Sequence, residues 1–322
     1  MNVRLSGVGS YLPERVLSNP DLEKMVDTTS EWILERTGIR ERRIAPDGVA
    51  TSDLATIAAQ RAMERAGISA GDVELIVVGT VTPDMMFPST ACLVQRNLQA
   101  TGAAAFDVGA ACSGFVYGLM TAASMISSGL YRNAIVIGAD TLSRITDWTD
   151  RGTCVLFGDG AGAVVLEPGE GILGSCLGAD GKGWDALMQP AGGSLMPATH
   201  ETVDKRLHTI KMNGNQVFKF AVRAMANSVI ECLDRCGMTR DDVNLLIPHQ
   251  ANTRIIEAAA ARLGIPLDRV AVNIDKCGNM SSASIPVALD QAVQSGRLKR
   301  GDVGVMVAFG GGLTWGTAAF RW

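Results

Sequence analysis

A cysteine in a run of small residues is the feature of this sequence most able to do chemistry. Residues 106–115 read Phe-Asp-Val-Gly-Ala-Ala-Cys-Ser-Gly-Phe, which predicts a short buried strand, a turn and a helix with Cys112 near its start. A thiol at a helix start faces unpaired backbone N–H groups and the positive end of the helix dipole, and both favour the reactive thiolate. Cys112 is therefore a candidate nucleophile, with a buried structural cysteine as the alternative.

Three further stretches place polar or small residues directly after apolar ones. His249 follows an apolar strand, where an imidazole suits proton transfer or oxyanion stabilisation but can also merely hydrogen-bond at a helix start. Asn279 lies in a polar turn before a helix, where asparagine is also a common N-cap. Gly310–Gly312 follow another apolar strand and would present unobstructed N–H groups, as in an oxyanion hole or in an ordinary tight turn.

The elements that must position these residues occur twice in the chain. Residues 67–79 and 237–249 match without gaps: a glycine, a turn, Asp-Val, a polar residue and an apolar strand. Residues 106–108 and 272–274 each precede a small-residue turn, a helix ending in Ser-Gly and a further apolar strand. Alternating strands and helices predict a sheet covered on both faces, and a repeat of about half the chain predicts two such units around a pseudo-twofold axis.

The repeat also predicts where the candidate residues meet. Residues 171–213 break the pattern with Gly, Pro and mixed charge, so we expect a linker and cap between an N-terminal half, 1–170, and a C-terminal half, 214–322. Ligands of such sheets sit beyond the carboxyl ends of the strands. Cys112 follows a strand of the first half, and His249 and Asn279 follow the expected strands 243–247 and 270–274 of the second. We expect the twofold relation to bring all three together.

The composition limits the class of protein. Of 322 residues, 47% are hydrophobic and 19% are charged, as in a globular protein with a large core. The net charge of -4 gives no bulk reason to expect nucleic acid as a partner. The uncharged stretch Val108–Tyr131 is too rich in Gly, Ser and Thr to indicate a membrane span, and the N-terminus lacks the apolar core of a signal peptide.

Cysteine and histidine usage adds a prediction about metals and redox state. The chain has seven scattered cysteines with no CxxC pair and only three histidines. This pattern predicts no metal site and no disulfide framework. We expect reduced thiols in a cytoplasmic protein.

Together, four motifs are much more specific than any one of them. Ala111–Gly114, His249–Asn252, Gly278–Ser284 and Phe309–Gly316, in this order and spacing, closely resemble β-ketoacyl-acyl-carrier-protein synthase III, the initiating condensing enzyme of bacterial type II fatty-acid synthesis. The resemblance covers essentially the whole chain, including Thr28–Ile33 and Arg36–Ile39. It implies the thiolase-like α/β fold, a duplicated αβαβα layered architecture with halves related by a pseudo-twofold axis, and a homodimer.

The resemblance also implies a Cys-His-Asn triad of Cys112, His249 and Asn279. Cys112 takes an acyl group from acyl-CoA, and malonyl-acyl-carrier protein then loses carbon dioxide and attacks the acyl-cysteine to give a 3-oxoacyl-carrier protein. His249 Nε2–H and the Asn279 amide N–H would stabilise the charge that decarboxylation places on the thioester oxygen. The Cys112 and Gly311 N–H groups would form a separate oxyanion hole for acyl transfer. No cofactor is implied, because the CoA thioester is a substrate.

Further positions carry over with less specific support. Trp32 would stack on the adenine of CoA, flanked by Arg36 and Arg151, whereas a half-buried core aromatic and solvated charges are the alternatives. The pantetheine tunnel would be lined by Thr28, Gly152, Phe218, Ala251 and Asn252. Four cations would receive the acidic carrier protein or simply aid solubility: Lys219, Arg223, Arg254 and Arg262. Phe87 matches the position that closes the partner's acyl pocket in the family. Because two methionines, unusual there, precede it, the primer length stays open.

Other functions compete with this interpretation. A related condensing enzyme of secondary metabolism would use malonyl-CoA or another acceptor, and a Cys-His-Asn hydrolase would need no malonyl donor. Biosynthetic thiolase uses a second catalytic cysteine near its C-terminus. That function is disfavoured because the chain has no cysteine after Cys277. A nicotinamide-dependent oxidoreductase rests only on the glycines of residues 7–9 and 158–162, which lack the strand-GxGxxG-helix context.

Overall fold

The computed structural model describes residues 1–322, and its core contains two large sheets. The first sheet is formed by the N-terminal half and has five strands: β1 (Val3–Tyr11), β4 (Leu75–Gly79), β5 (Ala104–Val108), β6 (Ala134–Thr141) and β7 (Asp159–Pro168). Their order is β1-β7-β6-β4-β5. Strand β4 is parallel to β5 and β6, whereas β7 is antiparallel to β1 and β6.

The second sheet repeats this pattern. It has four strands: β8 (Ile172–Ala179), β11 (Leu245–Pro248), β12 (Val303–Gly310) and β13 (Thr314–Arg321). Their order, β11-β12-β13-β8, matches β4-β6-β7-β1, and each pair keeps its parallel or antiparallel sense. The registers match as well: Ile76 pairs with Ile135, and residues 170 positions further on, Leu246 and Val305, also pair. The predicted duplication is confirmed.

The counterpart of β5 is missing from the second sheet. The sequence predicts a strand at residues 270–274, but only Val270 pairs, in a single bridge to β11, and the chain then enters helix α10 (Ile274–Cys277). The predicted strand is therefore wrong. The physical reason is that a side chain takes the place of a neighbouring strand. Gln250 Oε1 accepts the Asn273 N–H at 3.0 Å, a hydrogen that would otherwise have paired with strand backbone. The turn that carries the candidate asparagine thus follows a helical turn.

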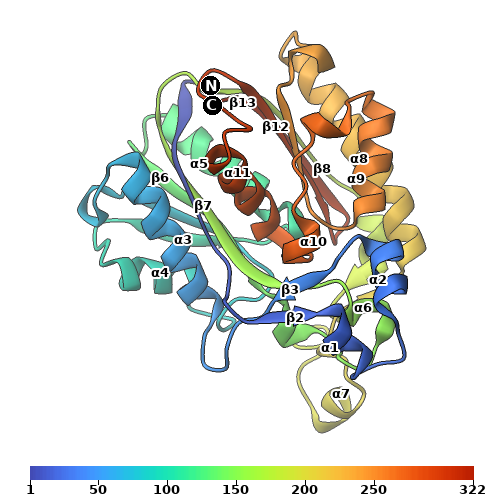
Figure 1. The fold of residues 1–322 in the computed structure, drawn as a ribbon. Helices are drawn as coiled ribbons and strands as arrows, with labels where there is room; N and C mark the ends of the chain where they lie inside the picture. Colours follow the sequence, from blue (N-terminus) through green and yellow to red (C-terminus); the bar gives the residue numbers. More distant parts are fainter.

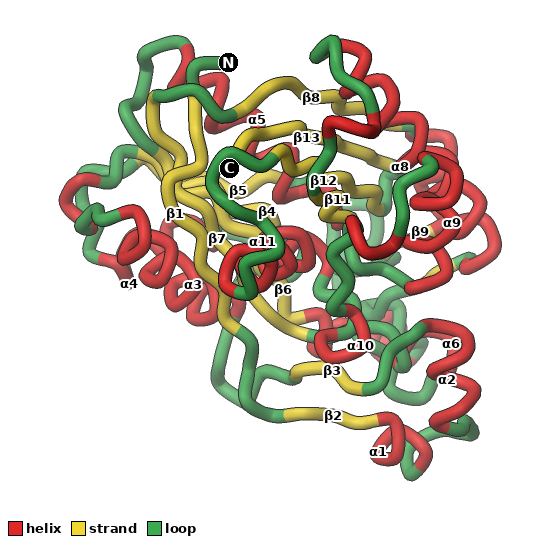
Figure 2. The backbone as a smooth tube through the Cα atoms, turned by 45° about the horizontal axis from the view of Figure 1, so that its top comes forward, coloured by secondary structure: helices red, strands yellow, loops and turns green.

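Helices fill three layers around the two sheets. The outer face of the first sheet is covered by α3 (Thr51–Ala66) and α4 (Thr90–Leu98), and that of the second by α8 (Gly214–Arg235) and α9 (Thr253–Leu263). Between the sheets lie α5 (Gly114–Ser127) and α11 (Ser284–Gln294), as Figures 1 and 2 show. This is the expected αβαβα layering, and its central layer holds the largest hydrophobic cluster.

Helix α5 is buried because its sequence is uncharged and rich in small residues. Gly118 faces the first sheet, where an added Cβ would lie 3.2 Å from Val77. The helix ends at Ser127, next to the predicted stop at Gly129, which lies in the left-handed region with φ of 81°. No helix of the structure is both long enough and apolar enough to cross a membrane.

The glycines of the two weak nucleotide-binding candidates serve packing. Gly7 and Gly9 lie in β1, where an added Cβ would come within 2.3 Å and 2.4 Å of the Ala62 backbone in α3. Gly162 in β7 packs in the same way on Pro286 of α11. Because neither run forms a loop at a helix N-terminus, the oxidoreductase alternative loses its only support.

The small elements cluster at one end of the molecule, around the lower part of Figure 1. They are α1 (Asn19–Glu23), α2 (Ser30–Thr37), α6 (Arg151–Cys154), α7 (His200–Asp204), β2 (Val16–Ser18) and β3 (Glu41–Arg43). A separate two-stranded sheet is formed by β9 (Leu187–Met188) and β10 (Lys211–Met212). The segment expected to be a linker, 171–213, differs from the expectation in its first part. It begins with β8, which completes the second sheet because it is the counterpart of β1.

Candidate active site

One cavity of about 280 Å³ gathers the three predicted catalytic side chains. Cys112 comes from the turn after β5, His249 from the end of β11, and Asn279 from the turn before α11. The halves therefore contribute as predicted, one residue from the first and two from the second. The expected convergence of all three at one cavity is what the geometry shows, although their chemical roles stay predictions.

Cys112 is buried beneath the surface of the protein. It lies in a 3-10 turn, Ala111–Ser113, that directly precedes α5, and Ala111 adopts a left-handed φ of 47°. The residue is 9% exposed, and burial raises the pKa of the Cys112 thiol to about 12. Burial disfavours the charged thiolate because the anion loses its hydration, which opposes the stabilisation predicted from the helix start.

His249 is held by backbone and ring contacts. Its N–H donates to Val307 O at 2.7 Å, which extends the β11–β12 pairing, and its ring packs edge-on against Phe309 at 5.4 Å between centroids. Nδ1 lies 2.6 Å from Ser284 Oγ. Burial lowers the pKa of His249 to about 3, so the imidazole is neutral at physiological pH. A neutral ring can donate from one nitrogen only.

Asn279 is fixed by its backbone on both sides. Its N–H donates to Leu156 O at 2.8 Å, and its carbonyl accepts the Gly158 N–H at 2.9 Å. Its side-chain Oδ1 accepts the Ser281 N–H at 2.9 Å. Because the oxygen is occupied, the Nδ2 group is left to donate to a ligand. The amide therefore has the orientation that an electrostatic role in the cavity requires.

Gly310 keeps the Cys112 N–H accessible. In the first half, Asp140 at the end of β6 accepts the Ser282 N–H at 3.1 Å. The repeat offset of 170 residues relates Asp140 to Gly310 and Ser282 to Cys112. Gly310 has no side chain that could accept the Cys112 N–H as Asp140 accepts that of Ser282. An added Cβ on Gly310 would lie only 2.6 Å from Cys112 N. No acceptor side chain therefore fits at this position, which leaves the Cys112 N–H for an oxyanion.

A second, mainly apolar cavity of about 270 Å³ also borders Cys112. Gly311, predicted to complete the oxyanion hole, borders it together with Cys112. Its apolar wall includes Val81, Leu142, Ile145 and Ile210. Phe87 does not contribute to it and is 85% exposed in the single chain, so its assignment to an acyl pocket stays a prediction.

Most of the predicted tunnel residues border the first cavity. They are Trp32, Arg36, Gly152, Phe218, Ala251 and Asn252. Asn252 Nδ2 donates to Arg36 O at 2.9 Å, which holds α2 beside α9. Arg151 and Thr28 are not part of the wall. The guanidinium groups of Arg151 and Arg36 nevertheless lie 4.8 Å and 6.0 Å from the centroid of the Trp32 ring.

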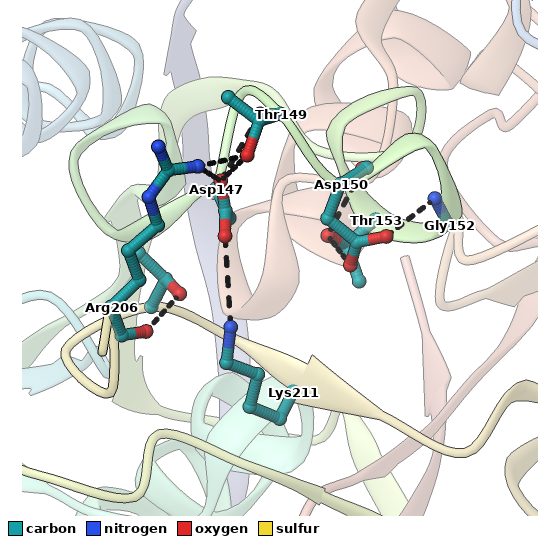
Figure 3. A network of polar contacts seen from close by, with 8 residues as sticks. Asp147, Thr149, Asp150, Gly152, Thr153, Arg206 and Lys211 are labelled. Carbon is teal, nitrogen blue, oxygen red and sulfur yellow. Dashed lines mark hydrogen bonds and ion pairs between the residues drawn. The ribbon is translucent and has the colours of Figure 1, made fainter. Parts of the chain in front are cut away.

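A polar network braces this wall (Figure 3). Asp147 Oδ1 accepts from Arg206 at 3.0 Å, and its Oδ2 lies 3.7 Å from Lys211 Nζ. Asp150 Oδ1 accepts the Gly152 N–H at 2.9 Å. The network joins the loop of α6 to the segment after α7, and the neighbour of Lys211, Met212, also borders the cavity. Part of the expected cap therefore forms the tunnel wall.

The four cations predicted for the carrier protein are exposed on α8 and α9. Lys219 and Arg223 border a separate surface groove with Lys182. The Arg254 guanidinium lies 5.8 Å from the Phe218 ring centroid, at the tunnel wall, and Arg262 Nη2 lies 3.4 Å from Asn227 Oδ1. Their role in docking stays a prediction.

Several residues of the site were not found from the sequence. The apolar wall includes Leu156, Phe157, Leu187, Val217 and Phe309, which carry no chemical signal of their own. Gly310 and Ser284 were quoted only as parts of motifs. The repeat offset of 170 residues, visible in the sequence, pairs each of them with a first-half residue and was the signal that could have found them.

Comparisons with known proteins agree with this geometry. Family models described as 3-oxoacyl-[acyl-carrier-protein] synthase III and its C-terminal part match residues 106–181 and 233–322. A curated relative from Caldanaerobacter subterraneus, "Beta-ketoacyl-[acyl-carrier-protein] synthase III", is 60% identical over 98% of this chain and 96% of its own.

Solved structures give the same result. The 3-oxoacyl-[acyl-carrier-protein] synthase III of Aquifex aeolicus is 48% identical, with a TM-score of 0.92 over 99% of this chain and 100% of its own. A priming β-ketosynthase from a polyketide biosynthetic pathway is 37% identical, with a TM-score of 0.92 over 99% of this chain and 96% of its own.

Proposed function

Because this chain belongs to the 3-oxoacyl-[acyl-carrier-protein] synthase III family, we propose that Cys112, His249 and Asn279 catalyse the initiating condensation of fatty-acid synthesis. The enzyme is a condensing acyltransferase. It joins the acyl group of acyl-CoA to malonyl-acyl-carrier protein and releases CoA and carbon dioxide. The observation that carries the residue assignment is the convergence of the three side chains on one cavity.

In the first half-reaction Cys112 Sγ attacks the thioester carbonyl of acyl-CoA. The bond from the carbonyl carbon to the CoA sulfur breaks, and the thiol proton ends on the departing CoA. The pKa of the Cys112 thiol, raised to about 12 by burial, means that deprotonation accompanies attack rather than precedes it. The Cys112 and Gly311 N–H groups stabilise the tetrahedral oxyanion, and loss of one such donor costs about 3 kcal/mol.

In the second half-reaction malonyl-carrier protein loses carbon dioxide. The electron pair of the broken bond moves onto the thioester as an enolate, whose oxygen accepts from His249 Nε2–H and Asn279 Nδ2–H. The enolate carbon then attacks the acyl-cysteine carbonyl, the bond from that carbon to the Cys112 sulfur breaks, and the departing thiolate takes up a proton from water. A neutral His249 is compatible with this role, because one of its ring nitrogens still carries an N–H that can donate to the oxygen.

Partners and setting follow from the same proposal. Trp32, Arg36 and Arg151 would hold the CoA nucleotide, and the exposed cations on α8 and α9 would attract the acidic carrier protein. We propose a homodimer in which the exposed Phe87 meets the second subunit. The seven free cysteines support a reducing, cytoplasmic setting. The reaction uses no resident cofactor.

Mass spectrometry tests the nucleophile. Incubation with acetyl-CoA should add one acetyl group to the wild-type protein and none to Cys112→Ala. Acetylation of the variant would show that another residue is the acceptor. His249→Ala should still be acetylated but should release little carbon dioxide from malonyl-carrier protein, and unchanged release would reject the donor role.

A second function is favoured by the similarity to the polyketide priming enzyme. Such an enzyme would accept another starter or acceptor at the same triad. A panel of acyl-CoA primers against malonyl-carrier protein and malonyl-CoA separates the two functions. Efficient condensation of a short primer with malonyl-carrier protein supports fatty-acid initiation, whereas a preference for malonyl-CoA supports the second function.

A further inference from the structure

The hydrogen bond between His249 and Ser284 is fully buried. Ser284 Oγ lies 2.6 Å from His249 Nδ1, 2.9 Å from Ser281 O and 3.4 Å from the Gln250 N–H. A serine hydroxyl has one proton to give. Ser281 O already accepts the backbone N–H of Ser284, so it stays paired if the hydroxyl turns away from it. The hydroxyl gives this proton either to His249 Nδ1, the shorter contact, or to Ser281 O, in which case Nδ1–H donates to the hydroxyl.

The duplication shows that the fold itself does not need this serine. The residues 170 positions before His249 and Ser284 are Gly79 and Gly114, at the same places in the first half. These two glycines touch directly, since a Cβ on Gly79 would lie 2.5 Å from the Gly114 carbonyl carbon. The same junction is thus built from two glycines in one half and from a hydrogen-bonded His-Ser pair in the other. The pair therefore has a role beyond packing.

We propose that Ser284 is a positioning residue that sets the tautomer of His249. Its hydroxyl donates to Nδ1, so the single ring proton resides on Nε2, the nitrogen left to serve the cavity together with the Asn279 amide. Burial keeps the pKa of His249 near 3, and the ring stays neutral, so the partner of Nδ1 decides which nitrogen donates. The opposite tautomer would offer a lone pair to the enolate oxygen and repel it.

The inference rests on the proposed function only for its kinetic consequence. Acylation of Cys112 uses backbone N–H donors, whereas decarboxylation uses Nε2–H. Loss of the Ser284 hydroxyl should therefore slow the second half-reaction selectively. Loss of the hydrogen-bond partner that orients a catalytic group, or a wrong histidine tautomer, typically lowers the rate 10-fold to 10⁴-fold. We expect about 10- to 100-fold here, because the ring keeps its backbone and Phe309 contacts.

The tautomer can be measured directly. The chain has three histidines, so the ¹⁵N spectrum of histidine-labelled protein contains few ring signals. In the wild type, one ring should show a protonated Nε2 and a bare Nδ1, unchanged between about pH 5 and 8 because its pKa lies below this range. Ser284→Ala should shift this ring toward the Nδ1–H tautomer. A wild-type His249 protonated on Nδ1 would overturn the proposal.

Kinetics supply the second readout. Ser284→Ala and Ser284→Gly, the latter copying Gly114, should acetylate Cys112 within about twofold of wild type and lose about 10- to 100-fold in malonyl decarboxylation. Ser228→Ala is the matched control, because Ser228 is also buried and its hydroxyl pairs with Thr317, which does not border the site. Equal losses in both half-reactions, or none, would overturn the proposal. A wild type without condensation activity would instead refute the proposed function and leave the spectral test decisive.

Discussion

Gly310→Ala tests the oxyanion hole without touching the three catalytic side chains. The added methyl would lie 2.6 Å from Cys112 N, so the two backbones must separate by about 0.8 Å to reach ordinary contact at 3.4 Å. Such a shift moves the Cys112 N–H away from the position of the oxyanion. A displacement approaching 1 Å costs about 100-fold, and loss of a donor costs about 3 kcal/mol, so both routes give a similar magnitude.

The assay is the pre-steady-state rate at which acetyl-CoA acylates Cys112, followed by mass spectrometry. We expect Gly310→Ala to acylate about 100-fold more slowly. Gly304→Ala is the matched control in the same strand, because its added methyl would meet the Phe320 ring at 2.4 Å, far from the site. Urea unfolding of both variants separates lost stability from lost chemistry. If Gly310→Ala acylates within a few-fold of wild type, the Cys112 N–H is not an oxyanion donor.

Three other predictions follow from burial and stacking. The rate at which iodoacetamide alkylates Cys112 should keep rising with pH up to about pH 9, because the thiol pKa is about 12. A rate that reaches a plateau near neutral pH would contradict this. His249 has a folded pKa of about 3, below its unfolded value, so its stabilisation is full above about pH 6.5 and is lost as the pH falls toward 3. The difference reaches about 5 kcal/mol, and urea unfolding of His249→Gln should show a weaker acid dependence than wild type. Trp32→Ala should raise the KM for acetyl-CoA about tenfold and leave the KM for malonyl-carrier protein unchanged; equal effects on both would refute adenine stacking.

Local patterns were enough to predict most elements around the site. The helix at Thr253–Leu263 and the end of α5 before Gly129 agree with the sequence prediction, because apolar periodicity and glycine stops are local properties. The strand expected at 270–274 failed because an amide from a different segment, Gln250, occupies the backbone that would have paired. The local pattern of residues 270–274 does not show that a side chain from another segment competes with a neighbouring strand for this backbone.

The sequence by itself determined the repeat, most of the strands and helices that carry the site, and the identities of Cys112, His249 and Asn279 as the candidate catalytic residues. Only the tertiary structure decided how these residues behave. It buries Cys112, which raises the pKa of its thiol, and it pairs His249 with Ser284 and Cys112 with Gly310. Hydration and contacts between distant segments are set when the two halves pack, so no window of the sequence holds them.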